Sequence, residues 1–198
     1  MPRVMPKLPF AVQWPILLCA ACAHEPMRAD AATIVEPPEI TAPFKLALIP
    51  SIDVSAIPDD EVCSRSPVTR DLCVTHFRTA FEVGLTSLVG HVFSQAPGDE
   101  SIRIELRLKK FSHRPTSMNV GGFNTSRVDL AWSLRVIDSR GAIRLDLQES
   151  TQSPQPMTFG GNHDAVTARL VRATLEDVGR ALFSHFEALQ TPFGVNGP

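Results

Sequence analysis

Apolar positions repeat with two different periods along the chain. The segment SIRIELRLKK at 101–110 alternates apolar with charged side chains, which predicts a strand with one face in water. The segment 127–149 alternates twice around DSRG, and this predicts a hairpin whose turn contains Gly141. A shorter apolar run that begins at Phe44 and is stopped by Pro50 predicts a first strand.

Two further segments show the period of three to four residues that marks one buried face of a helix. The first predicts a helix over 74–93, with apolar positions Phe77, Phe81, Leu85, Leu88 and Val92. The second predicts a long helix, with apolar positions Val171, Leu175, Val178, Leu182, Phe186 and Leu189. Asn162 or Asp164, after Gly160 and Gly161, is expected to cap its start.

The resulting order is strand, helix, three strands, helix. Amphipathic helices must cover the apolar face of a sheet, so the fold class is α/β (α+β), a two-layer sandwich. We expect about four strands in a mixed sheet with both helices on one face. The single domain should span 44–190, followed by a flexible tail at 191–198. The pattern leaves open whether the first strand lies beside the second or the fourth.

The N-terminus predicts export and a lipid anchor. A basic start and an apolar run of about a dozen residues are typical of a secretory signal peptide over 1–21. The exit LCAAC resembles a bacterial lipobox, which implies lipidation of Cys22; Cys19 is the alternative site. An ordinary signal peptide ending near Ala23 also stays open. Ala23 resembles the residue that follows the cysteine in lipoproteins sorted to the outer membrane, so we expect the periplasmic side of that membrane.

The segment 22–43 contains four prolines and no apolar period, and therefore predicts a lipidated N-terminus followed by a flexible tether. The domain that follows contains Cys63 and Cys73. Outside the cytoplasm such a pair is expected to form a disulfide, with free thiols or a metal site as alternatives.

Charge and motifs restrict the function classes. The chain carries 19 basic and 21 acidic side chains, and removal of the signal leaves a net charge of −4, which gives no reason to expect nucleic acid. We find no catalytic or cofactor motif, so the sequence predicts neither an enzyme nor a cofactor or metal. His163 and Asp164 in GGNHDA could bind an anion, although a simple helix start explains them.

Two surfaces are candidates for binding. The segment 111–128 reads as a long loop, and its Met118, Val120 and Phe123 could dock a protein or an acyl chain. The polar sheet face is rich in arginine, which suits anionic lipid or another polyanion. Its arginines are Arg103, Arg107, Arg127, Arg135 and Arg144.

The lipobox, the tether and the pattern SRVDLAWSLRVIDSRGAIRLDLQE before a C-terminal helix resemble small envelope lipoproteins of Gram-negative bacteria. These include auxiliary lipoproteins of lipid-transporting ABC systems, the lipoprotein of the lipopolysaccharide-insertion barrel, and YajG-like lipoproteins. The resemblance covers roughly 100–190 and implies a non-catalytic binding or scaffold role in an envelope transport or assembly complex. The alternatives are a regulator of a periplasmic cell-wall enzyme and an anionic-lipid-binding protein.

Overall fold

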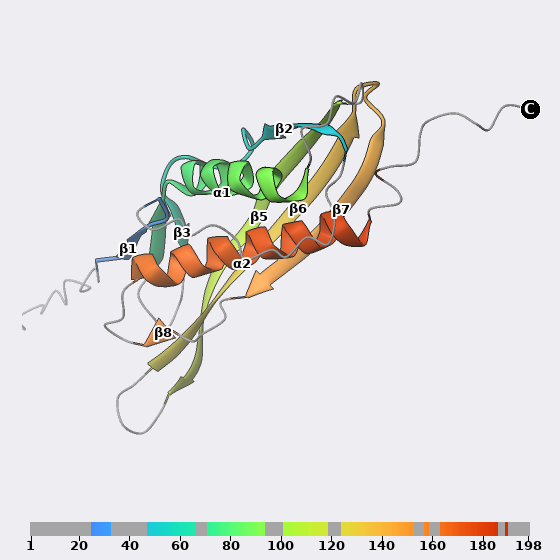
Figure 1. Cartoon of the computed structure of the whole chain (residues 1–198). Coiled ribbons are helices and arrows are strands. Elements are labelled where there is room, and N and C mark those ends of the chain that lie inside the picture. Colours follow the sequence, from blue (N-terminus) through green and yellow to red (C-terminus); the bar gives the residue numbers. More distant parts are fainter. Residues whose placement is uncertain are drawn as a thin grey trace, which may run out of the picture.

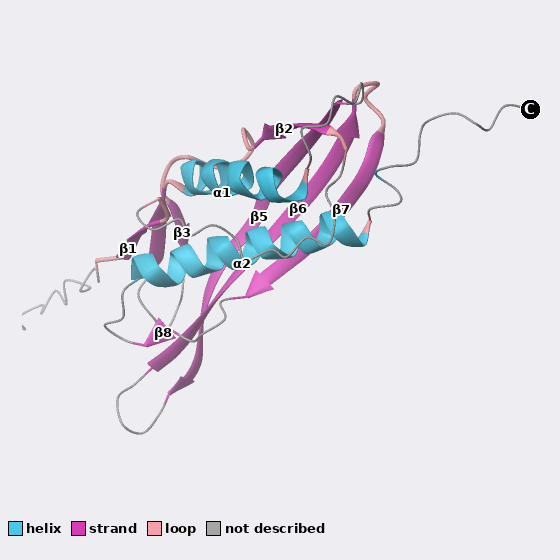
Figure 2. Ribbon diagram, viewed as in Figure 1, coloured by secondary structure: helices cyan, strands magenta, loops and turns pink. Residues whose placement is uncertain are grey.

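A sheet and two helices form the two layers of the protein in a computed structural model (Figures 1 and 2). The structure describes residues 25–32, 47–65, 71–93, 101–118, 124–152, 157–158, 163–185 and 189. The main sheet has the order β2 (Ile49–Asp53), β5 (Ser101–Met118), β6 (Asn124–Asp138) and β7 (Ile143–Gln152), and β8 (Met157–Thr158) pairs with β6. Helices α1 (Phe77–Val92) and α2 (His163–Ser184) cover one face. The predicted two-layer α+β sandwich is confirmed.

The first strand of the main sheet lies beside the second, because β2 pairs with β5 in parallel. The alternation predicted along the hairpin is also confirmed: Trp132 on β6 faces the helices and is buried. The turn after β6 is closed by a 3.0 Å hydrogen bond from the Gly141 amide to the Asp138 carbonyl. Gly141 has a φ of 84°, which glycine adopts without strain.

A second, smaller sheet was not foreseen from the sequence. It has the order β1 (Met27–Asp30), β4 (Leu72–Thr75) and β3 (Val62–Ser64). Strand β4 occupies the start of the expected helix 74–93, and so α1 begins only at Phe77. His76 separates the two elements with a left-handed φ of 58°. The β-branched Val74 and Thr75 favour the strand, and their pairing with β1 overrides the helical period.

Strand β1 also lies within the segment 22–43 that we expected to be a tether. Its residues pair in parallel with β4 from Met27 to Asp30, and Ala29 and Ala31 are buried in the core. The ordered domain therefore begins well before residue 44. The segments 1–24, 33–46 and 190–198 lie outside the described residues.

The two helices pack closely through a glycine on α1. A Cβ atom at Gly84 would overlap Leu175 Cδ1 on α2, so only glycine permits this approach. Phe77 and Phe81 of α1 are fully buried in the core. The Phe77 ring packs edge-to-face against Phe111 of β5, with 5.5 Å between the ring centroids. Within the described residues, neither helix combines the length and the apolar character needed to cross a membrane.

Candidate functional site

The predicted disulfide is present and links the two antiparallel strands of the small sheet. Cys63 on β3 and Cys73 on β4 stand opposite each other and are bonded through their sulfur atoms. The Glu61 carboxylate lies 3.7 Å from Cys63 Sγ. Because both thiols are used in the covalent bond, these three residues cannot act together as a metal site.

The expected docking loop 111–128 is mostly sheet, which corrects the sequence interpretation. Strand β5 runs to Met118 and β6 begins at Asn124, so the two strands form a ribbon that extends beyond both helices (Figure 1). Alternation breaks in this segment because the pairing shifts register between Leu108 and Lys110 and again between Pro115 and Ser117. Met118 ends β5, while Val120 and Phe123 lie outside the described residues.

Each arginine of the candidate anion-binding face has a carboxylate partner. Arg103 and Arg107 both reach Glu105, at 3.1 and 3.2 Å, and the Glu105 side chain is only 10% exposed. The remaining pairs are Arg127 with Asp129 at 3.1 Å, Arg135 with Asp146 at 3.0 Å, and Arg144 with Asp138 at 3.2 Å. An anion on this face would have to compete with these internal partners.

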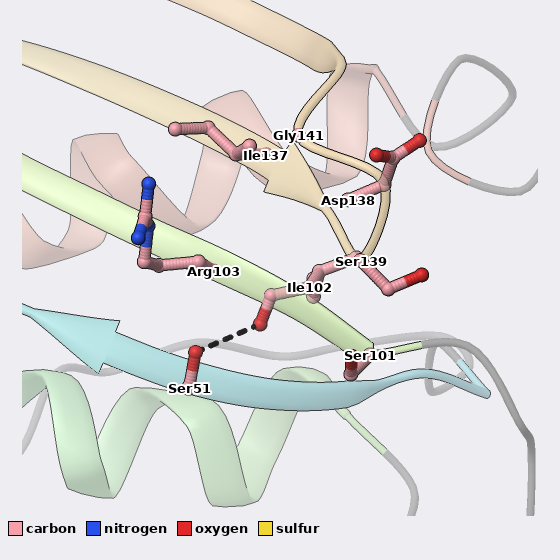
Figure 3. Close-up of a pocket in the computed structure, with 8 residues that line it drawn as sticks. All are labelled: Ser51, Ser101, Ile102, Arg103, Ile137, Asp138, Ser139 and Gly141. Carbon is pink, nitrogen blue, oxygen red and sulfur yellow. Dashed lines mark hydrogen bonds between the residues drawn. The ribbon is translucent and has the colours of Figure 1, made fainter.

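A pocket of about 320 Å³ lies where β2, β5 and the turn after β6 meet (Figure 3). Its hydroxyl groups come from Ser51, Ser101 and Ser139, and the Ser51 hydroxyl donates to the Ile102 carbonyl at 3.2 Å. The Asp138 carboxylate is already used by the turn. Although burial alone raises its pKa, the amides of Ala142 and Arg140 and the guanidinium of Arg144 lower the pKa below its ordinary value.

A second pocket, of about 280 Å³, lies between β7 and the C-terminal half of α2, and we call it the β7–α2 groove. Leu147 and Glu149 of β7 line one side, and Asp177, Arg180 and Ala181 of α2 line the other. Other lining residues are Trp132, Ser150, Ser184 and His185. The groove therefore combines an apolar floor with a charged rim.

A short hydrogen-bond chain holds the floor of the groove in place. The Trp132 indole Nε1 donates to Thr151 Oγ1 at 3.0 Å, and this hydroxyl donates to Asp177 Oδ2 at 2.6 Å. Asp177 also pairs with Arg180. A buried indole needs such an acceptor, and a threonine hydroxyl can accept and donate at once. The chain fixes α2 against the last strand of the sheet.

Two histidines meet at the opposite end of α2. The His113 amide of β5 donates to Ser64 Oγ of β3 at 2.6 Å, and the His113 ring is buried. Among the residues that the structure describes, neither ring nitrogen of His113 has a hydrogen-bond partner, and the same holds for His163 Nδ1 at the start of α2. Burial lowers the pKa of His113, and the nearby His163 lowers it further. Burial also lowers the pKa of His163, against the opposing effect of Asp164.

Asp164 lies in the first turn of α2 and connects this helix to the small sheet. Its Oδ1 accepts the amide of Asp30 at 2.8 Å and so joins α2 to the end of β1. The Asp30 carboxylate in turn lies 3.0 Å from His76 Nδ1 at the start of α1. Asn162 lies outside the described residues.

Together these features define a class of protein: a two-layer α+β sandwich with a disulfide-linked accessory sheet and a groove beside its last strand. No family model matches the sequence, and no curated protein matches it. A solved structure, the DUF330 protein XCC0632 from Xanthomonas campestris, is similar at a TM-score of 0.54 and 10% identity. The alignment covers 83% of this chain and 99% of that one.

A second solved structure, described as an uncharacterized protein, aligns at a TM-score of 0.41 and 10% identity, covering 82% of this chain and 99% of the other. At these identities the likeness to XCC0632 establishes a shared fold. The groove could not be found from the sequence, because its two sides come from elements about thirty positions apart whose contact depends on how α2 crosses the sheet.

Proposed function

We propose that this protein is a lipid-anchored periplasmic lipoprotein that acts as a non-catalytic binding or scaffold component of an envelope transport or assembly complex. The observation that carries the proposal is the position of β1. Met27 begins a strand of the folded domain only five positions after Cys22, the cysteine of the lipobox-like LCAAC. The proposed signal peptide would therefore end a few residues before the first strand of the fold.

This spacing sets how far the domain can stand from its anchor. Five residues span at most about 18 Å even when fully extended. A lipid on Cys22 would hold the small sheet close to the bilayer surface rather than at the end of a long tether. Several acyl chains, at about 0.8 kcal/mol per buried methylene, would make this attachment stable.

The disulfide gives independent support for an extracytoplasmic location. Cys63 and Cys73 are bonded across β3 and β4, and such bonds persist mainly in oxidising compartments. The proposed binding role rests on the β7–α2 groove.

Metabolic labelling with a fatty-acid analogue tests the anchor. We expect Cys22→Ser to abolish the label and to move the protein out of the membrane fraction. Cys19→Ser is the matched control, since it changes the neighbouring cysteine, and it should keep both the label and the membrane fraction. Equal labelling of wild type and Cys22→Ser would reject the lipid anchor on Cys22.

A pull-down from detergent-solubilised envelopes tests the binding role. The wild-type protein should recover the components of one transport or assembly complex in constant proportion. Recovery of a cell-wall synthase alone would favour the regulatory alternative instead, and recovery of no protein above a mock preparation would reject the scaffold role.

A further inference from the structure

The two edges of the main sheet are unequal. At one edge, β2 is a strand of five residues that contains Pro50. At the other edge, β7 has ten residues, IRLDLQESTQ, with neither proline nor lysine. Proteins usually protect sheet edges by short strands, proline, lysine or bulges. The β2 edge combines a short strand with a proline, whereas β7 has one register shift near its start and is regular beyond it.

Strand β7 is regular over most of its length. Its pairing with β6 runs without a break from Leu145 opposite Val136 to Gln152 opposite Asp129, and the single register shift lies before Leu145. Within the described part of the chain, no strand pairs with β7 on the side away from β6. The amides and carbonyls on that side form a template for one more strand.

The groove beside this edge specifies what the additional strand should carry. Leu147 and Ala181 make one part of the groove apolar, while Glu149 and Asp177 place carboxylates along its rim. Asp177 is paired with Arg180. Glu149 is exposed, and among the described side chains no cation is paired with it. A strand with one apolar and one basic side chain on the helix-facing side would satisfy both.

A second copy of this chain cannot supply that basic side chain through β7. In antiparallel pairing, directly opposed residues point to the same face of the sheet. The side chains of β7 that share the helix-facing side with Glu149 are Leu145, Leu147 and Thr151, which stand opposite the buried Val136, Leu134 and Leu130, and none of them is basic. Two β7 edges paired together would therefore leave Glu149 without a cation.

We propose that the β7 edge and the β7–α2 groove bind an extended segment of a partner protein as an additional strand, with an apolar side chain in the groove and a basic side chain beside Glu149. Main-chain hydrogen bonds to β7 provide affinity, and the two side-chain positions provide specificity. The strand-addition proposal specifies the kind of partner for the scaffold role proposed above, and it rests on that role.

Hydrogen exchange of the full chain in detergent tests strand addition, with synthetic peptides as the probe. One peptide of about eight residues alternates Thr with Val and Lys, and the other carries Glu in place of Lys. The Lys peptide should slow exchange at alternate β7 amides about tenfold or more and leave β2 unchanged. Equal protection by both peptides, protection by neither, or protection at β2 would overturn the proposal.

Two charge variants on adjacent positions of β7 sharpen the test. Glu149→Lys should weaken capture of the Lys peptide about fivefold to tenfold and strengthen capture of the Glu peptide. Gln148→Lys adds the same charge to the opposite face of the strand and should leave the preference unchanged. If both variants lose the Lys peptide equally, the groove does not select the partner.

Hydrogen exchange measured without peptide tests whether a second copy of the chain occupies the β7 edge. Protection of β7 that rises with protein concentration would mean that a second copy covers the edge, and it would overturn the proposal. The anchor is tested separately by labelling Cys22→Ser, so failure of the peptide experiment leaves the membrane assignment standing, and failure of the labelling leaves strand addition standing.

Discussion

The two ends of the helical layer differ in how they are held together. The end that contains the small sheet, which we call the attachment end, is joined by the disulfide Cys63–Cys73, by Asp30 to Asp164, and by the His113 amide to Ser64. The other end, around β7 and the last turns of α2, has a groove of about 280 Å³ and an open strand edge. Three long-range links therefore lie where the chain leaves toward its proposed anchor, and the proposed binding edge lies away from it.

Trp132→Ser should have the largest effect, because it removes the buried support of the open edge. The indole is 1% exposed and is the only group in the described structure that donates to Thr151 Oγ1. Replacing such a side chain leaves a cavity and costs about 3–5 kcal/mol of unfolding free energy. Denaturant unfolding measures this loss. Ser150→Ala, on the exposed face of the neighbouring strand, is the control and should cost less than about 0.5 kcal/mol.

The paired change Cys63→Ser with Cys73→Ser should loosen the attachment end next. Closing a loop of this size stabilises a fold by about 3 kcal/mol in the chain-entropy model. The double variant should therefore unfold at lower denaturant but keep the groove, and peptide capture at β7 should persist. Wild type treated with reductant is the matched control and should reproduce the loss. A double variant as stable as oxidised wild type would contradict this assignment.

The features that could be predicted from the sequence are those with a local signal. The alternation over 127–149 located the hairpin, its turn and the inward position of Trp132. The bond between Cys63 and Cys73 could be predicted because they are the two cysteines that follow the proposed lipid site, and a pair outside the cytoplasm is expected to oxidise. Helix periods located α1 and α2 to within a few residues.

The features that were missed depend on contacts between distant segments. Strand β1 has only four residues, and its pairing with β4 connects positions more than forty apart in the sequence. The ribbon was read as a loop because two register shifts break its alternation. The sequence placed the five arginines on one sheet face but did not show which carboxylate each of them pairs with. The histidine contact between β5 and α2 has no sequence signal at all.

Two glycines on α1 sharpen the comparison along a single helix. Gly84 touches α2, whereas a Cβ atom at Gly90, nearer the far end of α1, meets no atom within 4 Å. Gly84→Ala should cost a net of about 1–2 kcal/mol, because Leu175 must move in a filled core. Gly90→Ala should stabilise by about 0.5–1 kcal/mol through helix propensity. Thermal unfolding of both variants measures the opposite signs; a shift in the same direction would show that α1 is packed evenly.

The smallest expected effect is acid sensitivity of the attachment end through His113. Burial, and next the nearby His163, lower the pKa of His113 below 6.5, so the unfolded chain binds the proton more readily than the fold. Stability should therefore fall as the pH drops below about 6.5, by at most about 1.4 kcal/mol per pH unit for each such histidine.

In the described part of the chain, Ser64 of β3 accepts the His113 amide, His163 of α2, which is followed by Asp164, acts electrostatically on the His113 ring, and no group offers that ring a hydrogen bond. His113→Gln should flatten the fall in denaturation midpoint between pH 7 and pH 5, a window above the ordinary pKa of 3.8 for Asp30 and Asp138. His91→Gln, at an exposed position of α1, is the matched control and should leave the slope unchanged. If His113→Gln keeps the wild-type pH dependence of the midpoint while His91→Gln removes it, the acid-sensitive group does not lie at the attachment end. The contrast between the two ends would then rest on the disulfide and on the Asp30–Asp164 link alone.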